Sequence, residues 1–343
     1  MSKPRKIIKY KGVVENTLRD RGYEPVLNEN GEPTIIGSGA FGVIYLVKDR
    51  YGQLFAVKVA MNQRRHRNSI RILPRGHNDE VEIAQALKDN SNEYIVKFVD
   101  TILLEGFYII VMEYINGEPL SKFLGKKMKK GNWFTLAKCL VSAVLHIFRM
   151  SIVHRDIKPD NIMVILGDDG KIKSAKLIDF GLSRRVGKAP VPVPVSAIDS
   201  APTNSSAFEQ EQAYETDPIE RGFEEPARKR ACIDKTLCSW TETLLYSAPS
   251  IHKGPYSHEC DNYPLGLVLY GALLGKEVIP EDWEKYESVK EKYWNYPSTK
   301  KLEGCDEEMS KIIMLLLSSE KHSIQEVYDL IKSRPASLEQ PTH

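Results

Sequence analysis

The stretch H-R-D-I-K-P-D-N occupies His154 to Asn161, and D-F-G follows at Asp179 to Gly181. Phosphoryl transfer needs a carboxylate to accept the proton of a hydroxyl, and an amide plus a second carboxylate to hold magnesium ions. Asp156, Asn161 and Asp179 supply these groups at a workable spacing. Charged residues in a loop are usually solvated surface. Five typed positions followed by D-F-G nevertheless favour a site for phosphoryl transfer.

A glycine-rich motif, G-S-G-A-F-G-V, spans 37 to 43 and precedes F-A-V-K at 55 to 58. Glycines let a hairpin backbone approach phosphates closely, and Lys58 on a later strand can reach the same phosphates. The same glycine spacing occurs in dinucleotide-binding folds, where a helix follows it. Here a strand-like run, Val43 to Val47, follows instead. The order of elements therefore favours a hairpin that covers phosphates.

Hydrophobic periodicity predicts strands within 34 to 60 and at 94 to 103 and 106 to 113, and helices near 80 to 87 and 134 to 150. Strands therefore dominate the first part of the chain and helices the second. We expect an α+β fold of two lobes. The N-terminal lobe would be an antiparallel β-sheet with one helix, and the larger C-terminal lobe would be helical.

The segment from 184 to 238 is rich in Pro, Ser, Ala, Glu and Gln. Such a composition cannot bury enough apolar surface to offset its ordering entropy, so we expect a disordered insertion. The expected boundaries are an N-terminal extension at 1–30, a main domain at 31–335 made of a small lobe at 31–113, a connection at 113–117 and a large lobe at 118–335, and a tail at 336–343.

Composition limits the partners and the compartment. The 48 basic and 46 acidic side chains nearly cancel, so no bulk field favours nucleic acid or an anionic membrane. Five cysteines without a C-x-x-C pair argue against a disulfide framework or a zinc site. The N-terminus lacks the apolar core of a signal peptide, and apolar runs such as 265 to 275 are too short to span a bilayer. We expect a nuclear and/or cytoplasmic protein with no membrane or nucleic-acid partner.

With these motifs the chain resembles the eukaryotic protein kinase family, from about Ile36 to about Ile331. The resemblance implies an enzyme that transfers the γ-phosphate of ATP to hydroxyls of protein substrates, with Mg²⁺ or Mn²⁺ as the metal. Lys158, two residues beyond Asp156, is similar to the serine/threonine branch. The segment C-I-D-K-T-L-C-S further resembles partner-dependent kinases that fire replication origins, and T-L-L-Y-S-A-P resembles the cyclin-dependent group.

The resemblance also implies residue roles. The catalytic set would be Asp156 as the base, Lys158, Lys58, Glu80 and Thr243. The nucleotide would be bound by Ile36, Gly37, Gly39, Gly42, Val43, Ala56, Lys58, Met112, Glu113 and Ile115. Asn161 and Asp179 would hold the metal. Met112 can equally be a plain core residue at a strand end.

The glutamate that pairs with Lys58 is expected on the helix at 78 to 87. Both Glu80 and Glu82 lie at a suitable distance along the chain. Glu80 shares the inward helical face with Ile83, Ala84 and Leu87, so it is the preferred partner. Glu82 would then be an ordinary solvated residue.

Three departures from the family pattern stand out. The closing A-P-E is replaced by Ala248-Pro249-Ser250, and His322 lies near the position of the arginine that the missing glutamate would pair with. Joint loss of both partners costs less than loss of one, which indicates tolerated divergence. Ala84 replaces a large apolar side chain that usually stabilises the active helix position. We therefore hypothesise a loosely held helix that a protein partner or a loop phosphate helps to dock.

Regulation is expected to act through the insertion or through the helix at 78 to 87, where a regulatory subunit would dock. Arg155 would bind a phosphate on Ser239, with Thr241 as the second candidate. The segment E-E-P-A-R-K-R-A-C-I-D at 224 to 234 resembles a nuclear-import signal but is equally consistent with a solvated loop.

Two other functions fit the motifs less well. A pseudokinase scaffold would act by partner binding, yet such proteins generally lose Lys58, Asp156 or Asp179, and all three are present. A small-molecule kinase would lack a substrate segment like 241 to 249. A protein kinase is therefore the preferred interpretation.

Overall fold

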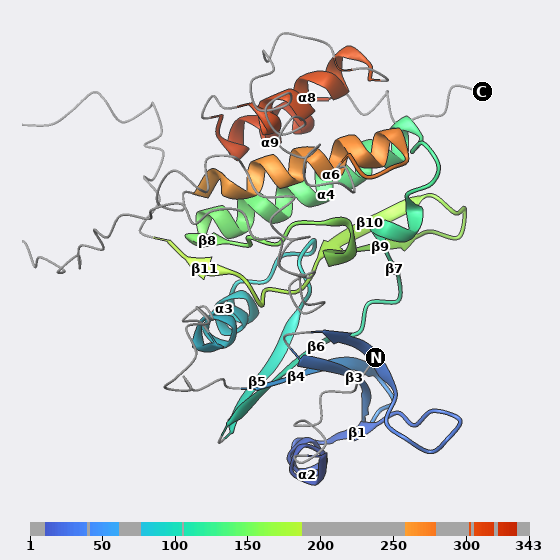
Figure 1. Cartoon of the computed structure of the whole chain (residues 1–343), viewed down its shortest axis with the longest axis vertical. Coiled ribbons are helices and arrows are strands. Elements are labelled where there is room, and N and C mark those ends of the chain that lie inside the picture. Colours follow the sequence, from blue (N-terminus) through green and yellow to red (C-terminus); the bar gives the residue numbers. More distant parts are fainter. Residues whose placement is uncertain are drawn as a thin grey trace, which may run out of the picture.

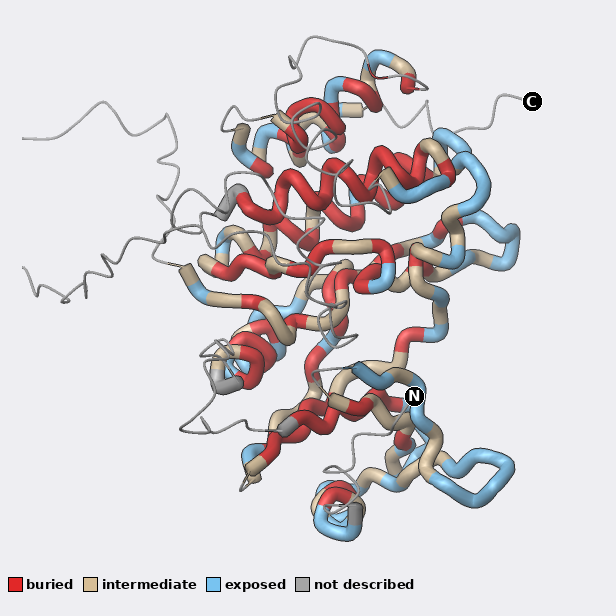
Figure 2. The backbone as a smooth tube through the Cα atoms, in the orientation of Figure 1, coloured by how far each residue is buried: buried red, intermediate tan, exposed pale blue. Residues whose placement is uncertain are grey.

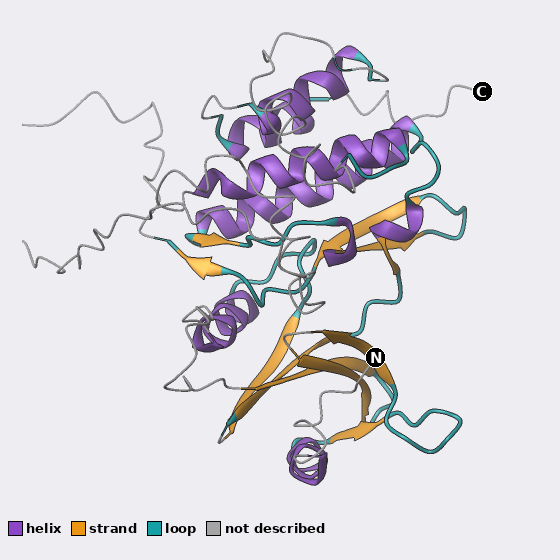
Figure 3. Ribbon diagram, in the orientation of Figure 1, coloured by secondary structure: helices purple, strands orange, loops and turns teal. Residues whose placement is uncertain are grey.

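The chain forms a sheet-rich small lobe and a helix-rich large lobe in this computed structural model, as Figure 3 shows by secondary structure. The described residues are 11–39, 42–61, 77–104, 106–186, 258–278, 302, 305–318 and 322–334. The small lobe contains α2 (Lys11–Asp20), β1 (Tyr23–Pro25), β2 (Ile35–Gly39), β3 (Gly42–Asp49), β4 (Leu54–Met61), α3 (His77–Asp89), β5 (Phe98–Leu104) and β6 (Phe107–Glu113). The large lobe contains β7 (Glu118–Pro119), η1 (Leu120–Phe123), α4 (Lys130–Arg149), β8 (Ile152–Val153), η2 (Pro159–Asn161), β9 (Ile162–Leu166), β10 (Ile172–Leu177), β11 (Arg184–Arg185), η5 (His258–Asp261), α6 (Asn262–Leu274), α8 (Glu307–Leu317) and α9 (Ile324–Lys332). This arrangement confirms the expected two-lobed α+β fold.

The small-lobe sheet is antiparallel, in the order β1-β3-β4-β6-β5, with β2 also paired to β3. Its register places Lys58 opposite Ile44 on β3 and opposite Ile110 on β6. Directly opposed residues project from the same face of a sheet. Lys58 therefore shares one face with Ile44 and Ile110, whereas the neighbouring residues Val57 and Val59 project from the other.

The face of the sheet opposite Lys58 is covered by α2, which Figure 1 shows beside β1. Val14 and Leu18 lie one helical turn apart on α2, are 6% and 2% exposed, and pack in one cluster with Val47 and Val57. Residues expected to form an N-terminal extension at 1–30 thus pack against this sheet. Within this stretch α2 buries an apolar stripe and β1 pairs with β3, so the described part of the extension packs on the small lobe.

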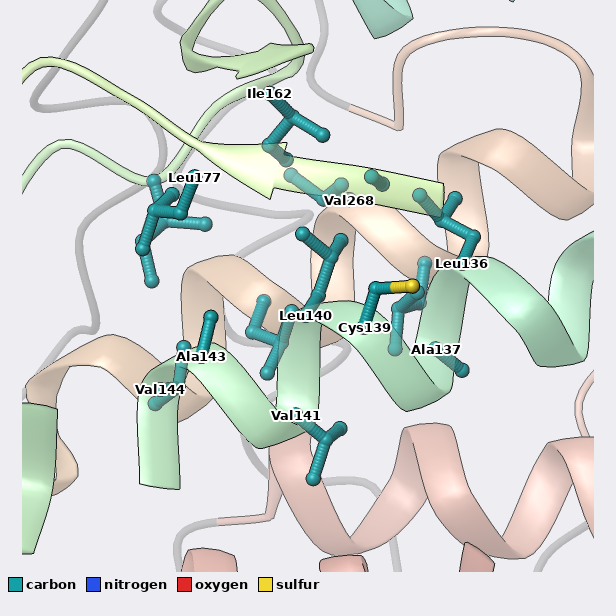
Figure 4. Packing of buried hydrophobic residues seen from close by; sticks show 14 of the residues in the cluster. Leu136, Ala137, Cys139, Leu140, Val141, Ala143, Val144, Ile162, Leu177 and Val268 are labelled. Atoms are coloured by element: carbon teal, nitrogen blue, oxygen red, sulfur yellow. The ribbon is translucent and has the colours of Figure 1, made fainter. Parts of the chain in front are cut away.

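The core of the large lobe lies around α4 and α6, which run side by side in Figure 1; in Figure 2 α6 is almost wholly buried and α4 buries one side. Figure 4 shows Leu136 and Leu140 of α4 pointing into this core, near Val268 of α6. The indole of Trp133 donates a 2.8 Å hydrogen bond to the Leu269 carbonyl. By length and composition alone α4 could cross a membrane, a feature that the sequence expectation had overlooked. Its burial in the lobe is that of a core helix.

Backbone hydrogen bonds join the lobes ahead of the connection at 113–117. The N–H of Val96 donates to the carbonyl of Leu177 at 3.0 Å, and the N–H of Leu177 donates to Tyr94 at 2.9 Å. Leu177 is the last residue of β10 and lies just before the D-F-G segment. These two hydrogen bonds therefore connect the D-F-G segment to the small lobe. The hydrogen bonds thus fix the position of the two lobes relative to each other next to the candidate site.

Ordered structure continues past the expected start of the insertion. Arg184–Arg185 form β11, which pairs antiparallel with Ile152–Val153 of β8. The expected disorder from residue 184 is thus wrong for 184–186, because this segment gains a strand partner. The remainder of the insertion lies outside the described residues.

Candidate active site

A buried carboxylate next to α6 holds the backbone of the loop at 154–161. Asp261, 1% exposed and immediately before α6, accepts hydrogen bonds from the backbone N–H of His154 at 2.6 Å and of Arg155 at 2.9 Å. Arg155 has φ 69°, a left-handed conformation that non-glycine residues seldom adopt. The two hydrogen bonds hold this turn and thereby fix the residue that follows, Asp156.

Asp156 is 7% exposed and bound by two neighbours from its own loop. The side-chain amide of Asn161 donates to Asp156 Oδ2 and to its backbone carbonyl, each at 2.8 Å. Lys158 Nζ lies 3.3 Å from Asp156 Oδ1. The carboxylate is thus held in one orientation beside a cation, as a group that accepts a proton from a bound hydroxyl requires.

The D-F-G segment is fixed by aromatic packing. Phe180 is 1% exposed, and its ring lies edge-on to His154 at 4.7 Å and to Phe98 at 5.8 Å between centroids. His154 Nε2 lies 3.1 Å from the carbonyl of Ile178. Asp179 has φ 60°, a second left-handed non-glycine residue. Strained backbone of this kind persists only where the surroundings hold it.

Lys58 lies between two carboxylates. Its Nζ is 2.6 Å from Glu80 Oε1 on α3 and 2.8 Å from Asp179 Oδ1. Burial acts to lower the Lys58 pKa, but Asp179 and Glu80 outweigh it, and the pKa is raised. Burial likewise acts to raise the Asp179 pKa, but Lys58 and the Gly181 N–H bring it down to about 2. Both groups are therefore charged at neutral pH.

Of the two candidate glutamates, Glu80 is the one beside Lys58. Glu80 is 4% exposed, whereas Glu82 is exposed on the outer side of α3. The second oxygen of Glu80 accepts a 2.5 Å hydrogen bond from the Tyr108 hydroxyl on β6. Sequence reasoning missed Tyr108. Its alternation with Ile110 and Met112, on the Lys58 face of β6, was the signal that could have found it.

The glycine-rich hairpin is formed by β2 and β3. Gly42 has φ 150°, and a Cβ there would lie 2.4 Å from the Val59 carbonyl, so only glycine fits. A Cβ on Gly37 would lie 3.2 Å from Ile44, and one on Gly39 would meet open space. Ile36, on β2, is 41% exposed.

Val43 projects from the sheet face opposite Lys58. It is 4% exposed and pairs with Val59, whereas Ile44 pairs with Lys58. Side chains alternate between the two faces along β3, so the pairing with β4 decides which of the two residues shares the Lys58 face. Ile44 therefore replaces Val43 as the residue that faces the site.

The expected base-binding residues lie where β4, β6 and the connection meet. Ala56 pairs with Met112, so both project on the Lys58 face, and Met112 also packs against the main core. The Glu113 N–H donates to the Lys97 carbonyl at 2.9 Å, so it is already bound within the small lobe. Ile115 is 9% exposed, and its carbonyl accepts from Gly117 at 3.0 Å.

The Glu113 side chain binds other residues of the protein. It accepts from the Lys97 N–H at 2.7 Å and lies 2.5 Å from Lys176 Nζ on β10. Lys176 is another residue that sequence reasoning missed. It ties the connection between the lobes to the strand that leads into Asp179.

The donors at Asn161 and Asp179 fit a magnesium-type cation. The Asn161 N–H groups bind Asp156, so its amide oxygen is the atom left for a cation, and Asp179 adds a carboxylate. The Ile178 N–H donates to the Asn161 carbonyl at 2.9 Å, which holds the two segments together. Magnesium takes oxygen ligands and uses one or two carboxylates together with substrate phosphates and waters. The described residues hold no cluster of three or more His, Cys, Asp or Glu side chains for a metal.

Several expected residues lie outside the described part of the chain: Thr243, Ser239, Thr241 and Ser250. His322, the other member of the replaced pair, is described. Its Nδ1 lies 3.3 Å from Glu326, and its carbonyl accepts from the Asn262 side chain at 3.1 Å. His322 thus packs at the start of α9.

Residues 32–199 match the family described as protein kinase domain. The chain is 34% identical over 155 residues to the "Negative regulator of sexual conjugation and meiosis" of Schizosaccharomyces pombe, which covers 44% of this chain and 31% of that protein. It is 32% identical over 177 residues to human "Mitogen-activated protein kinase kinase kinase 19", covering 51% and 12%. It is 25% identical over 284 residues to "Calcium-dependent protein kinase 6" of Plasmodium berghei, covering 81% and 15%. The chain thus spans less than a third of the length of these three relatives.

Proposed function

As this chain is a divergent member of the protein kinase family, we propose that it transfers the γ-phosphate of ATP to serine or threonine hydroxyls of protein substrates. The proposal is supported above all by Lys58, whose Nζ joins Glu80 at 2.6 Å and Asp179 at 2.8 Å. This arrangement brings a phosphate-binding cation, its positioning glutamate and a metal-binding carboxylate to one point. Both lobes contribute to it.

Asp156 takes the substrate proton in the proposed reaction. The hydroxyl oxygen forms a bond to the γ-phosphorus, the bond from that phosphorus to the β–γ bridging oxygen breaks, and ADP leaves. Asn161 holds the carboxylate of Asp156 from one side. Lys158, 3.3 Å from the other oxygen, neutralises charge on the transferring group. Its position two residues after Asp156 is the feature that supports a serine or threonine substrate.

The nucleotide would lie on the Lys58 face of the small-lobe sheet. The glycine-rich hairpin would cover the phosphates, and Lys58 would bind them. Ile44, Ala56 and Met112 share this face and would contact the base. Bound Mg²⁺, or Mn²⁺ in its place, would neutralise phosphate charge. Asn161 and Asp179 would hold it.

A pseudokinase scaffold is the competing function. It would need these lobes but not the joint presence of Lys58, Asp156 and Asp179 with their partners. The catalytic function is therefore favoured.

The test is a labelled-ATP assay on the intact chain with generic protein substrates. Asp156→Asn should lower turnover at least about 100-fold, because a positioned base contributes about 10²–10⁴-fold. Lys58→Met should weaken nucleotide use as well. Asp169 and Lys171, on the exposed β9–β10 turn, offer matched controls. Asp169→Asn and Lys171→Met should leave turnover unchanged.

Nucleotide binding measured in parallel separates the two functions. A chain that binds ATP yet transfers no more phosphate than Asp156→Asn is a scaffold, and the catalytic proposal is then wrong. Transfer that persists equally in Asp156→Asn and Lys58→Met would also contradict it, since another protein would be its source.

Control of activity is part of the proposal. Arg155 would bind a phosphate on Ser239 or Thr241, and a regulatory subunit would act on α3 or on the insertion. The near balance of charge supports a protein rather than a nucleic-acid partner, and the basic segment at 224 to 234 supports a nuclear as well as a cytoplasmic location. Phosphate mapping by mass spectrometry and imaging of the tagged chain test these points.

A further inference from the structure

The carboxylate of Glu80 has a donor on each oxygen. Lys58 Nζ lies 2.6 Å from Oε1, and the Tyr108 hydroxyl donates to Oε2 at 2.5 Å. All three side chains are buried, with Lys58, Glu80 and Tyr108 at 5%, 4% and 1% exposure. A carboxylate bound through both oxygens is fixed in rotation as well as in position.

Both donors come from the central strands of the sheet. Tyr108 pairs with Ala60 of β4, two residues along from Lys58, and Ile110 pairs with Lys58 itself. Tyr108 and Lys58 therefore project from the same face of adjacent strands. The rigid sheet supplies two anchoring points, and α3 supplies the single acceptor. Rotation or outward movement of α3 would break both hydrogen bonds together.

Ala84 is the smallest of the α3 residues buried in the main core cluster, where Val81, Ile83 and Leu87 also lie. Ala84 lies one turn after Glu80, is fully buried, and offers only a methyl group to the cluster that contains Phe98 and Phe180. Phe98 and Phe180 contact one another directly, with ring centroids 5.8 Å apart. Burial free energy scales with apolar area, so an alanine here stabilises the helix position less than a larger residue.

An ion pair that joins α3 to the large lobe is more exposed than the pair of Lys58 and Glu80. Asp79 Oδ2 lies 3.2 Å from Arg184 Nε on β11, and the two side chains are 36% and 17% exposed. Exposed ion pairs contribute little. The hydroxyl of Tyr108, by contrast, acts in a dry environment on a charged acceptor, where a hydrogen bond is strongest.

We propose that Tyr108 is a positioning residue: its hydroxyl holds Glu80, and hence α3, in the place from which Glu80 orients Lys58 toward the nucleotide phosphates. This inference rests on the proposed kinase function for its catalytic consequence, but the structural coupling stands without it. Burial, followed by the charge of Glu80, raises the pKa of Tyr108, so the hydroxyl remains a donor at neutral and mildly alkaline pH. A partner or loop phosphate would then act on a helix whose glutamate already has two donors.

The test is Tyr108→Phe, which keeps the buried ring and removes one hydroxyl. We expect the KM for ATP, and the dissociation constant of a fluorescent ATP analogue, to rise about tenfold, the lower range for a hydrogen bond to a charged group. The kcat should change less than the KM, because Asp156 is untouched. Amides of α3 should exchange hydrogen faster, while those of α4 keep their rate.

Tyr45→Phe is the matched control. Tyr45 lies on β3, on the sheet face that α2 covers, and loses the same atom. It should leave the KM and the exchange of α3 unchanged. A Tyr108→Phe variant with wild-type affinity and wild-type exchange of α3 would overturn the proposal, as would equal effects in both variants.

A double variant shows whether Tyr108 acts through Glu80. In a Glu80→Ala background, Tyr108→Phe should cause no further loss of affinity, because their shared contact is already gone. Additive losses would overturn the proposal. If the wild-type chain transfers no phosphate, the proposed function fails, but analogue binding and exchange of α3 still decide the role of Tyr108.

Discussion

Asp261 accepts a 2.6 Å hydrogen bond from the backbone N–H of His154, so a residue at the start of α6 determines the shape of a loop more than a hundred positions earlier. The same carboxylate binds the N–H of Arg155 at 2.9 Å, where the backbone has φ 69°. The loop that carries Asp156 therefore depends on a buried anion in another element.

Removal of this anion should damage both stability and activity. Asp261→Ala leaves two buried N–H groups without their acceptor, and each costs about 1–3 kcal/mol. We expect the free energy of unfolding, measured in urea, to fall by about 2–5 kcal/mol, and phosphate transfer by the folded protein to fall with it. Asp168→Ala, on an exposed turn, is the control. A loss no larger than in this control would mean that the loop holds its shape without Asp261.

Glycine is required at one position of the hairpin and dispensable at another. Gly42→Ala would place a Cβ 2.4 Å from the Val59 carbonyl and force an unfavourable φ of 150°, whereas Gly39→Ala meets open space. We expect Gly42→Ala to lower the free energy of unfolding by about 1–3 kcal/mol and to weaken ATP binding. Gly39→Ala should fold normally. Equal thermal stability of the two variants would contradict this hairpin geometry.

The pair of Lys58 and Asp179 predicts a pH dependence of stability. The Asp179 pKa is about 2, below the ordinary 3.8, so the charged form stabilises the folded state above pH ~4, and this contribution is lost as the pH falls toward 2. Because the Asp179 side chain is 34% exposed, solvent screening keeps its size on the order of 1 kcal/mol. Urea unfolding of the wild type and Asp179→Asn should therefore differ most above pH ~4 and converge near pH 2.

Lys58→Met provides the check on this cause. Without the cation, Asp179 loses the main group that lowers its pKa, and the difference caused by Asp179→Asn should become smaller and depend less on pH. An unchanged profile in the Lys58→Met background would show that Lys58 is not the cause.

The parts of the site that lie close together in sequence could be predicted from it. The loop at 154–161 carries its residue types within eight positions, and the helical periodicity around Ile83 separated Glu80 from Glu82. Each of these two predictions needed only one segment of the chain, a motif in the first case and a helical repeat in the second. The two-lobed fold followed from the same reasoning, because strand periods dominate the first part of the chain and helical periods the second.

Contacts that depend on tertiary register were not predictable. The Tyr108 hydroxyl meets Glu80 across 28 positions, and nothing local distinguishes this tyrosine from one that only packs. The face on which Val43 lies depends on the pairing of β3 with β4, where Val43 is opposite Val59 and Ile44 is opposite Lys58. A shift of one residue moves a side chain to the opposite face of a sheet. The role of α2 was missed because Val14 and Leu18 form too short a stripe to indicate a docking face alone.

The correction at Val43 leads to a final prediction, in which two neighbouring residues should behave differently. Ile44 projects on the Lys58 face and Val43 on the opposite, buried face. Ile44→Ala should raise the KM for ATP about three- to tenfold through lost apolar contact, with a small change in stability. Val43→Ala should lower the free energy of unfolding by about 2 kcal/mol and leave the KM within about twofold. ATP titration and urea unfolding of both variants decide the matter: weaker binding in Val43→Ala alone would restore the sequence expectation and show that the hairpin pairs in another register.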